Sequence, residues 1–372
     1  KTNTIINTIV TAFFNERTVL FASYNNHPIS GVFDKLTALT HRGKRIPFPV
    51  LRLGNVGKVE DALQYIKQVY KQAKDITVYN GALDKRKDDR KEKAKKLSAL
   101  LENYEKVLEL KDRKDAISRV MEYQKKNLLE MQMLPFQADL QCRQMVMVNE
   151  EILKAGVFTD EQAMGLIDAD FDKLKEYIYY TSARYIKRLG QNSYKDLYDI
   201  VFEMQGEEQV EASNKFLSKT ENIKRLQRIF PIIITTCISA HKLGKPEPMF
   251  DMVIMDEASQ CNTAVSLVPI IRGENLMLVG DPQQLNPVIL LDEVTNQKLR
   301  EKYKVTEEYD YRNNSIYKTF LACDSVSDEV LLRNHYRCHK KIIEFNNKKY
   351  YNSKLNVCTN SNEKEPLVFI DV

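Results

Sequence analysis

One short stretch decides the fold of this 372-residue chain: Met252-Val253-Ile254-Met255-Asp256-Glu257. A second stretch of the same design follows it, Leu276-Met277-Leu278-Val279-Gly280-Asp281-Pro282-Gln283-Gln284. Each begins with an apolar run typical of a parallel strand that is buried on both faces, and each ends in polar residues. Ligands of open α/β sheets bind where such strands end, so the two stretches predict one crevice lined by carboxylates and an amide.

The polar ends of these strands fit a magnesium nucleotide. We expect Asp256 to hold the metal, Glu257 to orient an attacking water and Gln284 to sense a γ-phosphate. A lone Asp-Glu pair after a core strand is more often an ordinary surface turn. The second polar strand end close by in the sequence is what favours the nucleotide site.

The start of the chain supplies a partner for this site. Lys1-Thr2 precedes a helical pattern of apolar residues over 5–13 and then a strand over 18–23. A phosphate-binding loop has the form Gly-x-x-x-x-Gly-Lys-[Ser/Thr] before a helix, and Lys1-Thr2 matches its last two residues. We therefore expect Lys1 to meet the β- and γ-phosphates and Thr2 to bind magnesium. Because the glycines of that loop are missing, we expect the chain to be a piece of a longer protein.

The character of the sequence changes twice along the chain. Residues 1–58 and 230–328 alternate helical and strand patterns, which is typical of a parallel α/β sheet. Residues 59–229 are helical throughout, with few glycines and prolines and with apolar residues every three or four positions. This pattern predicts an α/β domain that is interrupted by a helical insertion of the coiled-coil or stalk kind. Residues 329–372 are expected to begin a second α/β domain.

Several finer elements follow from local patterns. We expect strands over 329–332 and 366–372 and continuous helical sequence over 209–229. Pro135 is expected to end the longest helix, because proline forces its predecessor out of the helical region. That helix is expected to carry a break in register near residues 111–115.

The composition is that of an ordinary soluble protein. Hydrophobic residues make up 43% of the chain, yet its longest apolar runs fall far short of the roughly 20 residues that cross a bilayer. We therefore expect no membrane partner. The six cysteines are scattered without a Cys-x-x-Cys pair, so reduced thiols and a cytoplasmic location are expected. Cys338, with His335 and His339 nearby, lacks the second Cys/His pair of a zinc site.

Six short motifs follow one another in a fixed order. They are Lys1-Thr2 and residues 22–26, 235–237, 256–260, 280–285 and 334–339. Each is weak singly, but the series resembles superfamily 1B helicases, in particular the group typified by the nonsense-mediated-decay helicase and senataxin. The resemblance covers residues 1–56 and 230–372. In that family an insertion between these parts forms helical stalks, often with a small β-barrel, whereas the insertion here is helical throughout.

The resemblance implies a fold and an activity. The fold is the parallel sheet of a RecA-like P-loop NTPase, with residues 1–58 and 230–328 as the first RecA-like domain and 329–372 as the start of the second. The activity is ATP hydrolysis coupled to movement on single-stranded DNA or RNA, with family precedent for the 5′ to 3′ direction. ATP and Mg²⁺ are the implied cofactors. Residues 1–372 alone, without the phosphate-loop glycines and the later motifs, are expected to show negligible ATPase activity, whereas the full-length protein is expected to be an ATP hydrolase.

The resemblance also assigns roles at the γ-phosphate. Gln284 contacts this phosphate with Gln260 as a weaker neighbour, and Arg337 reaches it from the second domain. A fixed cation is independently sensible there, because charge on the transferring phosphoryl group needs one. The alternative for Arg337 is a surface salt bridge. The other implied roles agree with those argued above for Lys1, Thr2, Asp256 and Glu257.

Four residues match the strand-contacting motifs of that family. Ser23, Asn25 and Asn26 follow a predicted strand, and Thr236 lies at the end of another. Short polar side chains and backbone amides at such places would hold phosphates and sugars. Asn25-Asn26 equally fits a helix N-cap and turn, and the two interpretations are compatible.

A function of another class also fits the sequence. In this alternative the chain is a helical protein-interaction module, the insertion binds a protein partner, and the nucleotide site is regulatory or degenerate. The presence of Asp256, Glu257, Gln284 and Arg337 together argues against a degenerate site.

Overall fold

The structure is a computed structural model that describes residues 1–126, 135–156, 161, 165, 171–327 and 329–359. The chain divides into two compact units. The first contains residues 1–76 together with the described residues from 182 onward, and the second contains the described part of residues 77–181. Each unit is described by itself.

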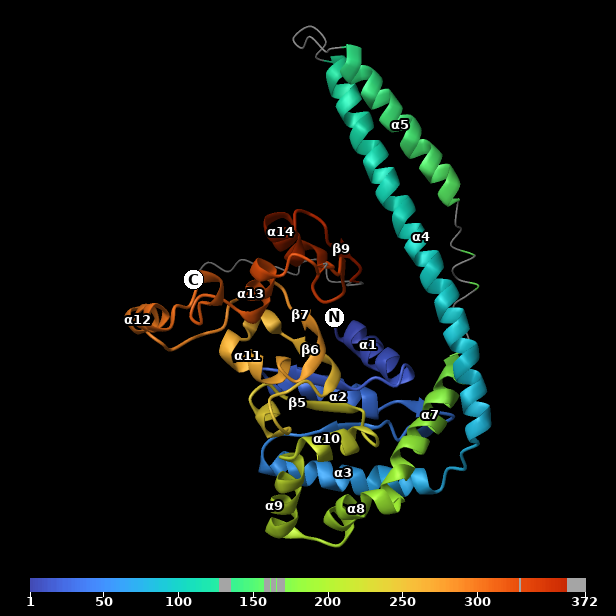
Figure 1. Ribbon diagram of the computed structural model, residues 1–372, viewed down its shortest axis with the longest axis vertical. Helices are drawn as coiled ribbons and strands as arrows, with labels where there is room; N and C mark the ends of the chain where they lie inside the picture. Colours follow the sequence, from blue (N-terminus) through green and yellow to red (C-terminus); the bar gives the residue numbers. More distant parts are fainter. Residues whose placement is uncertain (127–134, 157–160, 162–164, 166–170, 328, 360–372) are drawn as a thin grey trace. The chain divides into compact units, whose positions relative to one another are not determined.

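A parallel sheet forms the centre of the first unit (Figure 1). Its strands, in spatial order, are β4 (Val50–Arg52), β5 (Ile232–Thr236), β1 (Val19–Ser23), β6 (Phe250–Asp256) and β7 (Gly273–Val279). Every pairing between neighbours is parallel. All residues of β1 are buried, as expected for a strand covered on both faces. The predicted α/β fold with a parallel sheet is confirmed.

The pairing register aligns the carboxyl ends of four neighbouring strands. Ser23 pairs with Thr236 on one side and with Asp256 on the other. Asp256 in turn pairs with Val279. Positions from four distant parts of the sequence therefore form one row at this edge of the sheet.

The opposite ends of β1 and β6 are fastened by Asp251. Its Oδ2 accepts hydrogen bonds from the Thr18 backbone N–H at 2.8 Å and from the Thr18 hydroxyl at 2.7 Å. Its Oδ1 accepts one from Arg17 at 2.7 Å. Burial acts to raise the pKa of Asp251, but these hydrogen bonds outweigh burial and lower it. The carboxylate thus fixes the register that sets the row at the other edge.

Helices cover the sheet. Helix α1 (Thr2–Phe14) buries Ile5, Ile9 and Phe13, the face that its apolar spacing predicts. The Phe13 ring packs edge-on against Phe48, with ring centroids 5.1 Å apart. Helix α2 (Asn26–Thr37) contacts β1, β4 and β5, and α3 (Val56–Lys74) contacts β4.

The other helices of this unit are shorter. They are α8 (Lys195–Phe202), α9 (Gly206–Leu217), α10 (Thr220–Gln227), α11 (Thr263–Ile270), α12 (Glu293–Tyr303), α13 (Ile316–Cys323) and α14 (Lys340–Tyr350). The expected insertion 59–229 includes α3 and α8 to α10, which belong to the same compact unit as the sheet. Two short strand pairs complete the unit: β2 (Thr40–His41) with β3 (Lys44–Arg45), and β8 (Asn334–His335) with β9 (Asn356–Val357).

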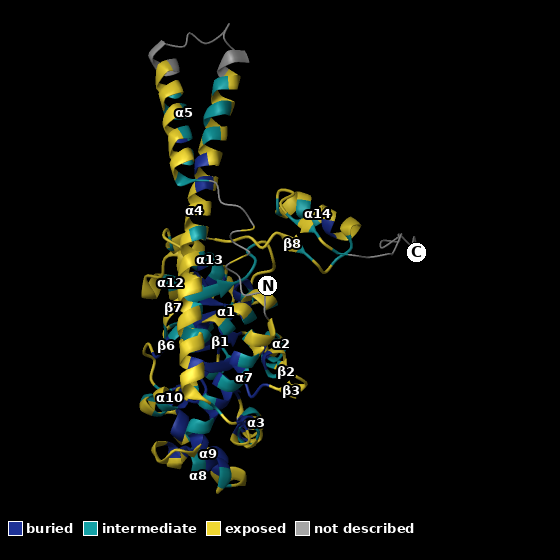
Figure 2. Cartoon of the chain, turned by 90° about the vertical axis from the view of Figure 1, so that its right-hand side faces the viewer, coloured by how far each residue is buried: buried dark blue, intermediate teal, exposed yellow. Residues whose placement is uncertain are grey.

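The second unit is helical. Helix α4 (Asn80–Lys126) packs against α5 (Pro135–Ala155). Many residues along both helices are exposed (Figure 2). The first residues of α7 (Phe171–Lys187) belong to this unit, where Glu176 pairs with Arg86 at 2.9 Å. None of the helices in the described ranges has the length and apolar composition needed to cross a membrane.

Several sequence-based expectations require correction. Pro135 was expected to end the longest helix, but it is the first residue of α5, a position that proline tolerates well. Helix α4 is continuous through residues 111–115, where a break in the apolar register was predicted. Residues 209–229 form two helices, α9 and α10, separated by Ser218 and Lys219. No strand forms over 329–332, because Val330 is 78% exposed and this segment pairs with no strand of the described chain. The strand expected over 366–372 lies outside the described residues.

We predict that Asp251→Asn destabilises the fold by about 1–3 kcal/mol, because an amide NH₂ must then face either Thr18 or Arg17, both of which are donors. Urea denaturation measures the change. The pKa of Asp251 is lowered, so its contribution is complete at pH 7 and is lost as the pH falls below the ordinary aspartate value of 3.8. The exposed Asp61→Asn control should stay within about 0.5 kcal/mol. Equal effects of both variants would contradict the assignment.

Candidate functional site

The site begins with an unusual turn at the end of β6. Asp256 is the last residue of this strand and is only 3% exposed. Glu257 follows in the left-handed conformation, with φ 55° and ψ 36°, which is uncommon for residues other than glycine. The Glu257 N–H donates to Asp256 Oδ1 at 2.8 Å. This turn ends the strand and brings two successive carboxylates within reach of the same side chain.

That side chain is Lys1. Its Nζ lies 2.9 Å from Asp256 Oδ1 and 2.5 Å from Glu257 Oε1. Lys1 is also the N-cap residue of α1, and its side chain makes no capping hydrogen bond. The first N–H groups of a helix attract anions, so an ammonium group and a helix N-terminus meet at this point. The structure therefore brings together three of the predicted site residues, although their roles stay predictions.

Burial and pairing act against each other in this cluster. Burial raises the pKa of Asp256, although the charge of Lys1 acts to lower it. For Lys1, burial acts to lower the pKa, but the hydrogen bond to Glu257 and the charge of Asp256 outweigh it and raise the pKa. We take Lys1 and Asp256 as charged, because Lys1 is partly solvated and lies within salt-bridge distance of both carboxylates. A buried carboxylate of this kind gains further from a divalent cation.

The end of β7 forms the second part of the site. Asp281 Oδ1 accepts from the Gln283 N–H at 3.0 Å, and Asp281 Oδ2 accepts from Gln284 Nε2 at 3.0 Å. The Asp281 N–H donates to Ser259 Oγ at 3.3 Å. Ser259 lies in the short 3₁₀ helix η4 (Ala258–Gln260) directly after Glu257. The two strand ends are therefore joined by a hydrogen bond, and the Gln284 amide faces Asp281.

Gly280 allows this close approach. A Cβ atom at this position would lie 2.9 Å from the Ser259 backbone nitrogen and 2.9 Å from the Tyr317 ring. Tyr317 comes from α13, whose first residue donates its N–H to the Cys261 carbonyl at 2.9 Å. Helix α13 thus packs against both strand ends, and only glycine fits between them.

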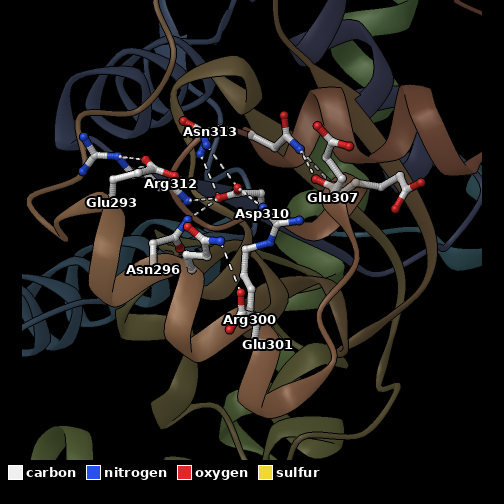
Figure 3. A network of polar contacts seen from close by, with 11 residues as sticks. Glu293, Asn296, Arg300, Glu301, Glu307, Asp310, Arg312 and Asn313 are labelled. Atoms are coloured by element: carbon white, nitrogen blue, oxygen red, sulfur yellow. Dashed lines mark hydrogen bonds and ion pairs between the residues drawn. The ribbon is translucent and has the colours of Figure 1, made fainter.

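A buried carboxylate orders the segment that leads to α13 (Figure 3). Asp310 is 2% exposed and accepts hydrogen bonds from Asn296 at 3.0 Å and from Arg300 at 2.9 Å. Asn313 adds two more, from its backbone and its side chain. Burial acts to raise the pKa of Asp310, but the hydrogen bonds from Asn296, from Asn313 and from the Arg312 N–H outweigh it and lower the pKa. The network fastens α12 to the turn that precedes Ser315, the N-cap of α13.

The remaining nucleotide-site candidates are spread around this centre. Thr2 is the first residue of α1 and is half-buried. Gln260 is also half-buried, and its N–H donates a hydrogen bond to the Glu257 carbonyl at 2.9 Å. Arg337 is exposed. Within the described chain it makes no hydrogen bond or ion pair with Lys1 or the two carboxylates.

The strand-contacting candidates differ in exposure. Ser23 is fully buried, and its hydroxyl has no hydrogen-bond partner among the described residues. Asn25 and Asn26 are exposed; Asn25 is the N-cap residue of α2, although its side chain makes no capping bond. Thr236 accepts the Ser239 N–H at 3.2 Å and donates to the Ser239 hydroxyl at 2.9 Å, so it also shapes a local turn.

The His335, Cys338 and His339 cluster has a structural role. His335 Nε2 accepts the Cys338 N–H at 2.8 Å, and His339 Nδ1 accepts the Lys341 N–H at 3.2 Å as the N-cap of α14. No group of three or more His, Cys, Asp and Glu side chains suited to a metal occurs among the residues that the structure describes.

Sequence reasoning missed Ser259, Tyr317 and Asp310. Their contacts join segments that are distant in the sequence, and nothing local distinguishes Ser259 or Tyr317. Asp310 carried one usable signal, because it opens the stretch 310–314, whose Asp and Asn residues are typical of a turn. In the structure its side chain accepts the Arg312 N–H at 2.9 Å, as in an Asx turn.

We predict that Gly280→Ala destabilises the fold by about 1–3 kcal/mol, because the new methyl group must displace backbone at Ser259 or the Tyr317 ring. Gly31→Ala is the matched control. Gly31 lies inside α2 with open space around the position of a Cβ, so this variant should gain up to about 1 kcal/mol. Denaturation midpoints check both changes, and a neutral Gly280→Ala would refute the tight contact.

Comparisons with known proteins identify a family for the chain. The family described as "AAA domain" matches residues 1–292, which is most of the chain. An uncharacterized ATP-dependent helicase of Methanocaldococcus jannaschii is 34% identical over 106 residues, 28% of this chain. The mouse DNA replication ATP-dependent helicase/nuclease DNA2 is 30% identical over 142 residues, 38% of this chain. The helicase SEN1 of Saccharomyces cerevisiae is 31% identical over 156 residues, 41% of this chain.

These alignments cover small parts of the relatives, namely 13%, 12% and 6% of their respective lengths. The family match nevertheless covers the sheet, α1 and both strand ends of the site. The chain belongs to the AAA domain family, among the superfamily 1 helicases of the nonsense-mediated-decay helicase and senataxin type.

Proposed function

We propose that the full-length protein is an ATP-dependent helicase or translocase that uses Mg²⁺ and moves along single-stranded DNA or RNA in the 5′ to 3′ direction. The observation that carries the proposal is the cluster of Lys1, Asp256 and Glu257 at the N-terminus of α1. A polyphosphate needs a cation and free N–H groups, and a metal needs a carboxylate. This cluster supplies all three.

The residues at this site fit a magnesium nucleotide. Lys1 and the first turn of α1 would hold the phosphates, while Asp256 and the Thr2 hydroxyl would hold the metal. Bound Mg²⁺ neutralises charge on the phosphates during hydrolysis. Asp256 suits this role because its burial makes a nearby cation favourable.

Glu257 is the proposed water-orienting group. Its Oε1 lies 2.5 Å from the Lys1 Nζ. A phosphate that attracts the Lys1 ammonium would weaken this ion pair and leave the carboxylate free to accept a proton from water. The contact therefore supports a site in which nucleotide binding itself prepares the base.

Three further residues complete the proposed site. Gln284 and, more weakly, Gln260 would contact the γ-phosphate, and Arg337 would reach it from the second RecA-like domain begun by residues 329–372. The exposure of Arg337 supports this role, because an arginine finger must be free to approach the phosphate.

The nucleic acid would lie across the row of strand ends. Exposed Asn25 and Asn26 would contact its backbone first, with Thr236 beside them. Ser23 matches the same motif and lies in the same row, but it is fully buried, so we assign it no direct contact with the nucleic acid. We further propose that α4 and α5 form the stalk of the insertion as a coiled coil, and that the protein is cytoplasmic.

A second candidate function rests on the helical unit. Helices α4 and α5 expose large apolar side chains, among them Leu101 at 51% and Met147 at 61%. Such side chains can bind a protein partner. In this alternative the nucleotide site is regulatory or degenerate, and partner binding would not depend on hydrolysis.

We predict that Glu257→Gln lowers kcat for nucleic-acid-stimulated ATP hydrolysis by about 100-fold or more, because an amide cannot act as a base. The amide still accepts a hydrogen bond from Lys1, so nucleotide affinity should change little. Steady-state hydrolysis and nucleotide titration of the full-length protein measure the two effects.

The matched control is Glu60→Gln, an exposed carboxylate on α3, which should leave hydrolysis unchanged. Stimulated hydrolysis that survives Glu257→Gln would remove this residue as the base. A full-length protein that shows no hydrolysis but binds a partner through α4 and α5 would favour the second candidate.

A further inference from the structure

A tyrosine from the far end of the chain contacts the loop of Gln284. The Tyr351 hydroxyl donates to Asp281 Oδ2 at 2.5 Å, a length typical of a charge-assisted O–H···O bond. The same oxygen accepts Gln284 Nε2 at 3.0 Å. One carboxylate oxygen therefore binds both the tyrosine and the amide. Burial and the hydrogen bond to Asp281 raise the pKa of Tyr351 to about 12, so its hydroxyl stays a donor at neutral pH.

The position of Tyr351 is set by a tightly bonded turn. Tyr351 follows α14, and its N–H donates to the Asn347 carbonyl at 3.2 Å. The Asn347 side chain bonds both backbone groups of Leu355, at 3.0 Å and 2.9 Å. Asn352 and Ser353, between them, have φ values of 49° and 60°. Non-glycine residues adopt this conformation at a cost, and such strain often marks a functional segment.

The same turn is linked to Arg337. After it, β9 pairs with β8, and β8 ends two residues before Arg337. The Asn356 N–H donates to the Arg333 carbonyl at 2.8 Å, and the Cys358 N–H donates to the His335 carbonyl at 2.8 Å. A short bonded path therefore connects the Arg337 segment to Tyr351, and through Asp281 to Gln284.

We propose that Tyr351 is a positioning residue for Gln284, because its hydroxyl holds the Asp281 carboxylate to which the Gln284 amide is bound. The proposal rests on the ATPase function proposed above. When the γ-phosphate competes for the Gln284 amide, Asp281 keeps Tyr351 as its partner and the loop stays ordered. Conversely, a shift of the Arg337 segment that removes Tyr351 would loosen the loop. The two sides of the site are in this way coupled through one carboxylate.

The test compares Tyr351→Phe with Tyr350→Phe in the full-length protein. Tyr350 is the matched control, because it is the neighbouring tyrosine, is 42% exposed and packs its ring near Lys349. The first readout is amide hydrogen exchange without nucleotide at Gln283 and Gln284, whose N–H groups bond to Asp281. Loss of the tyrosine hydroxyl should speed this exchange about tenfold, whereas the control should not.

The second readout is stimulated ATP hydrolysis. Tyr351 does not belong to the phosphate-binding cluster, so Tyr351→Phe should lower kcat about tenfold while KM for ATP stays within about twofold. An unchanged exchange rate or an unchanged kcat in Tyr351→Phe would overturn the proposal, and so would equal effects of Tyr351→Phe and Tyr350→Phe. A wild-type protein without stimulated hydrolysis would overturn the ATPase function and with it the positioning role. Hydrolysis that is intact in the wild type and in Tyr351→Phe would overturn the Tyr351 role alone.

Discussion

The parallel pairing of β5, β1, β6 and β7 is the constraint on which the rest of the structure depends. In a parallel sheet a shift of one residue moves every side chain to the other face, so the register has to be fixed. Here Asp251 and Thr18 fix it at the amino ends of β1 and β6. Ser23 and Asp256 therefore share one row, to which the pairings of β5 and β7 add Thr236 and Val279.

The row alone does not make a catalytic site, because strand ends usually diverge into separate loops. Three contacts keep these ends together: the left-handed Glu257, the Asp281–Ser259 hydrogen bond, and the packing of Tyr317 over Gly280. The Asp310 network supports the third contact from behind, since it orders the segment that leads into α13. The site is therefore built from stretches of chain that are distant in the sequence and are held together by hydrogen bonds at Asp281 and Asp310 and by the packing of Tyr317.

The sequence could predict the parts of this site that are local. The apolar runs that end in Asp256 and Asp281 predict two parallel strands with polar ends. Only β6 is largely buried as expected, because β7 lies at the edge of the sheet and none of its residues is buried. The spacing of Ile5, Ile9 and Phe13 predicts the buried face of α1. The predicted strand at 329–332 failed because an apolar run becomes a strand only where a neighbour offers hydrogen bonds.

The parts that could not be predicted are the long-range ones. The contact of Tyr351 with Asp281 spans 70 residues, and the contact of Lys1 with Glu257 spans 256. The order of the motifs indicated the contact of Lys1 with Glu257, because the lysine and the acidic end of a strand both match parts of a nucleotide-binding site. Nothing in the sequence around Tyr351 distinguishes it from Tyr350, so the contact of Tyr351 with Asp281 could be found only in the structure.

The charge balance of the central cluster bears on the order of binding. Lys1 contributes one positive charge, while Asp256 and Glu257 contribute two negative charges, which leaves one net negative charge in a partly buried place. A free nucleotide is itself strongly anionic, so these carboxylates oppose its entry. In the proposed function, a nucleotide that already carries Mg²⁺ would bring a cation to Asp256 and would replace the ion pair of Lys1. For the proposed function, the net charge of this cluster therefore favours the metal–nucleotide complex as the species that binds.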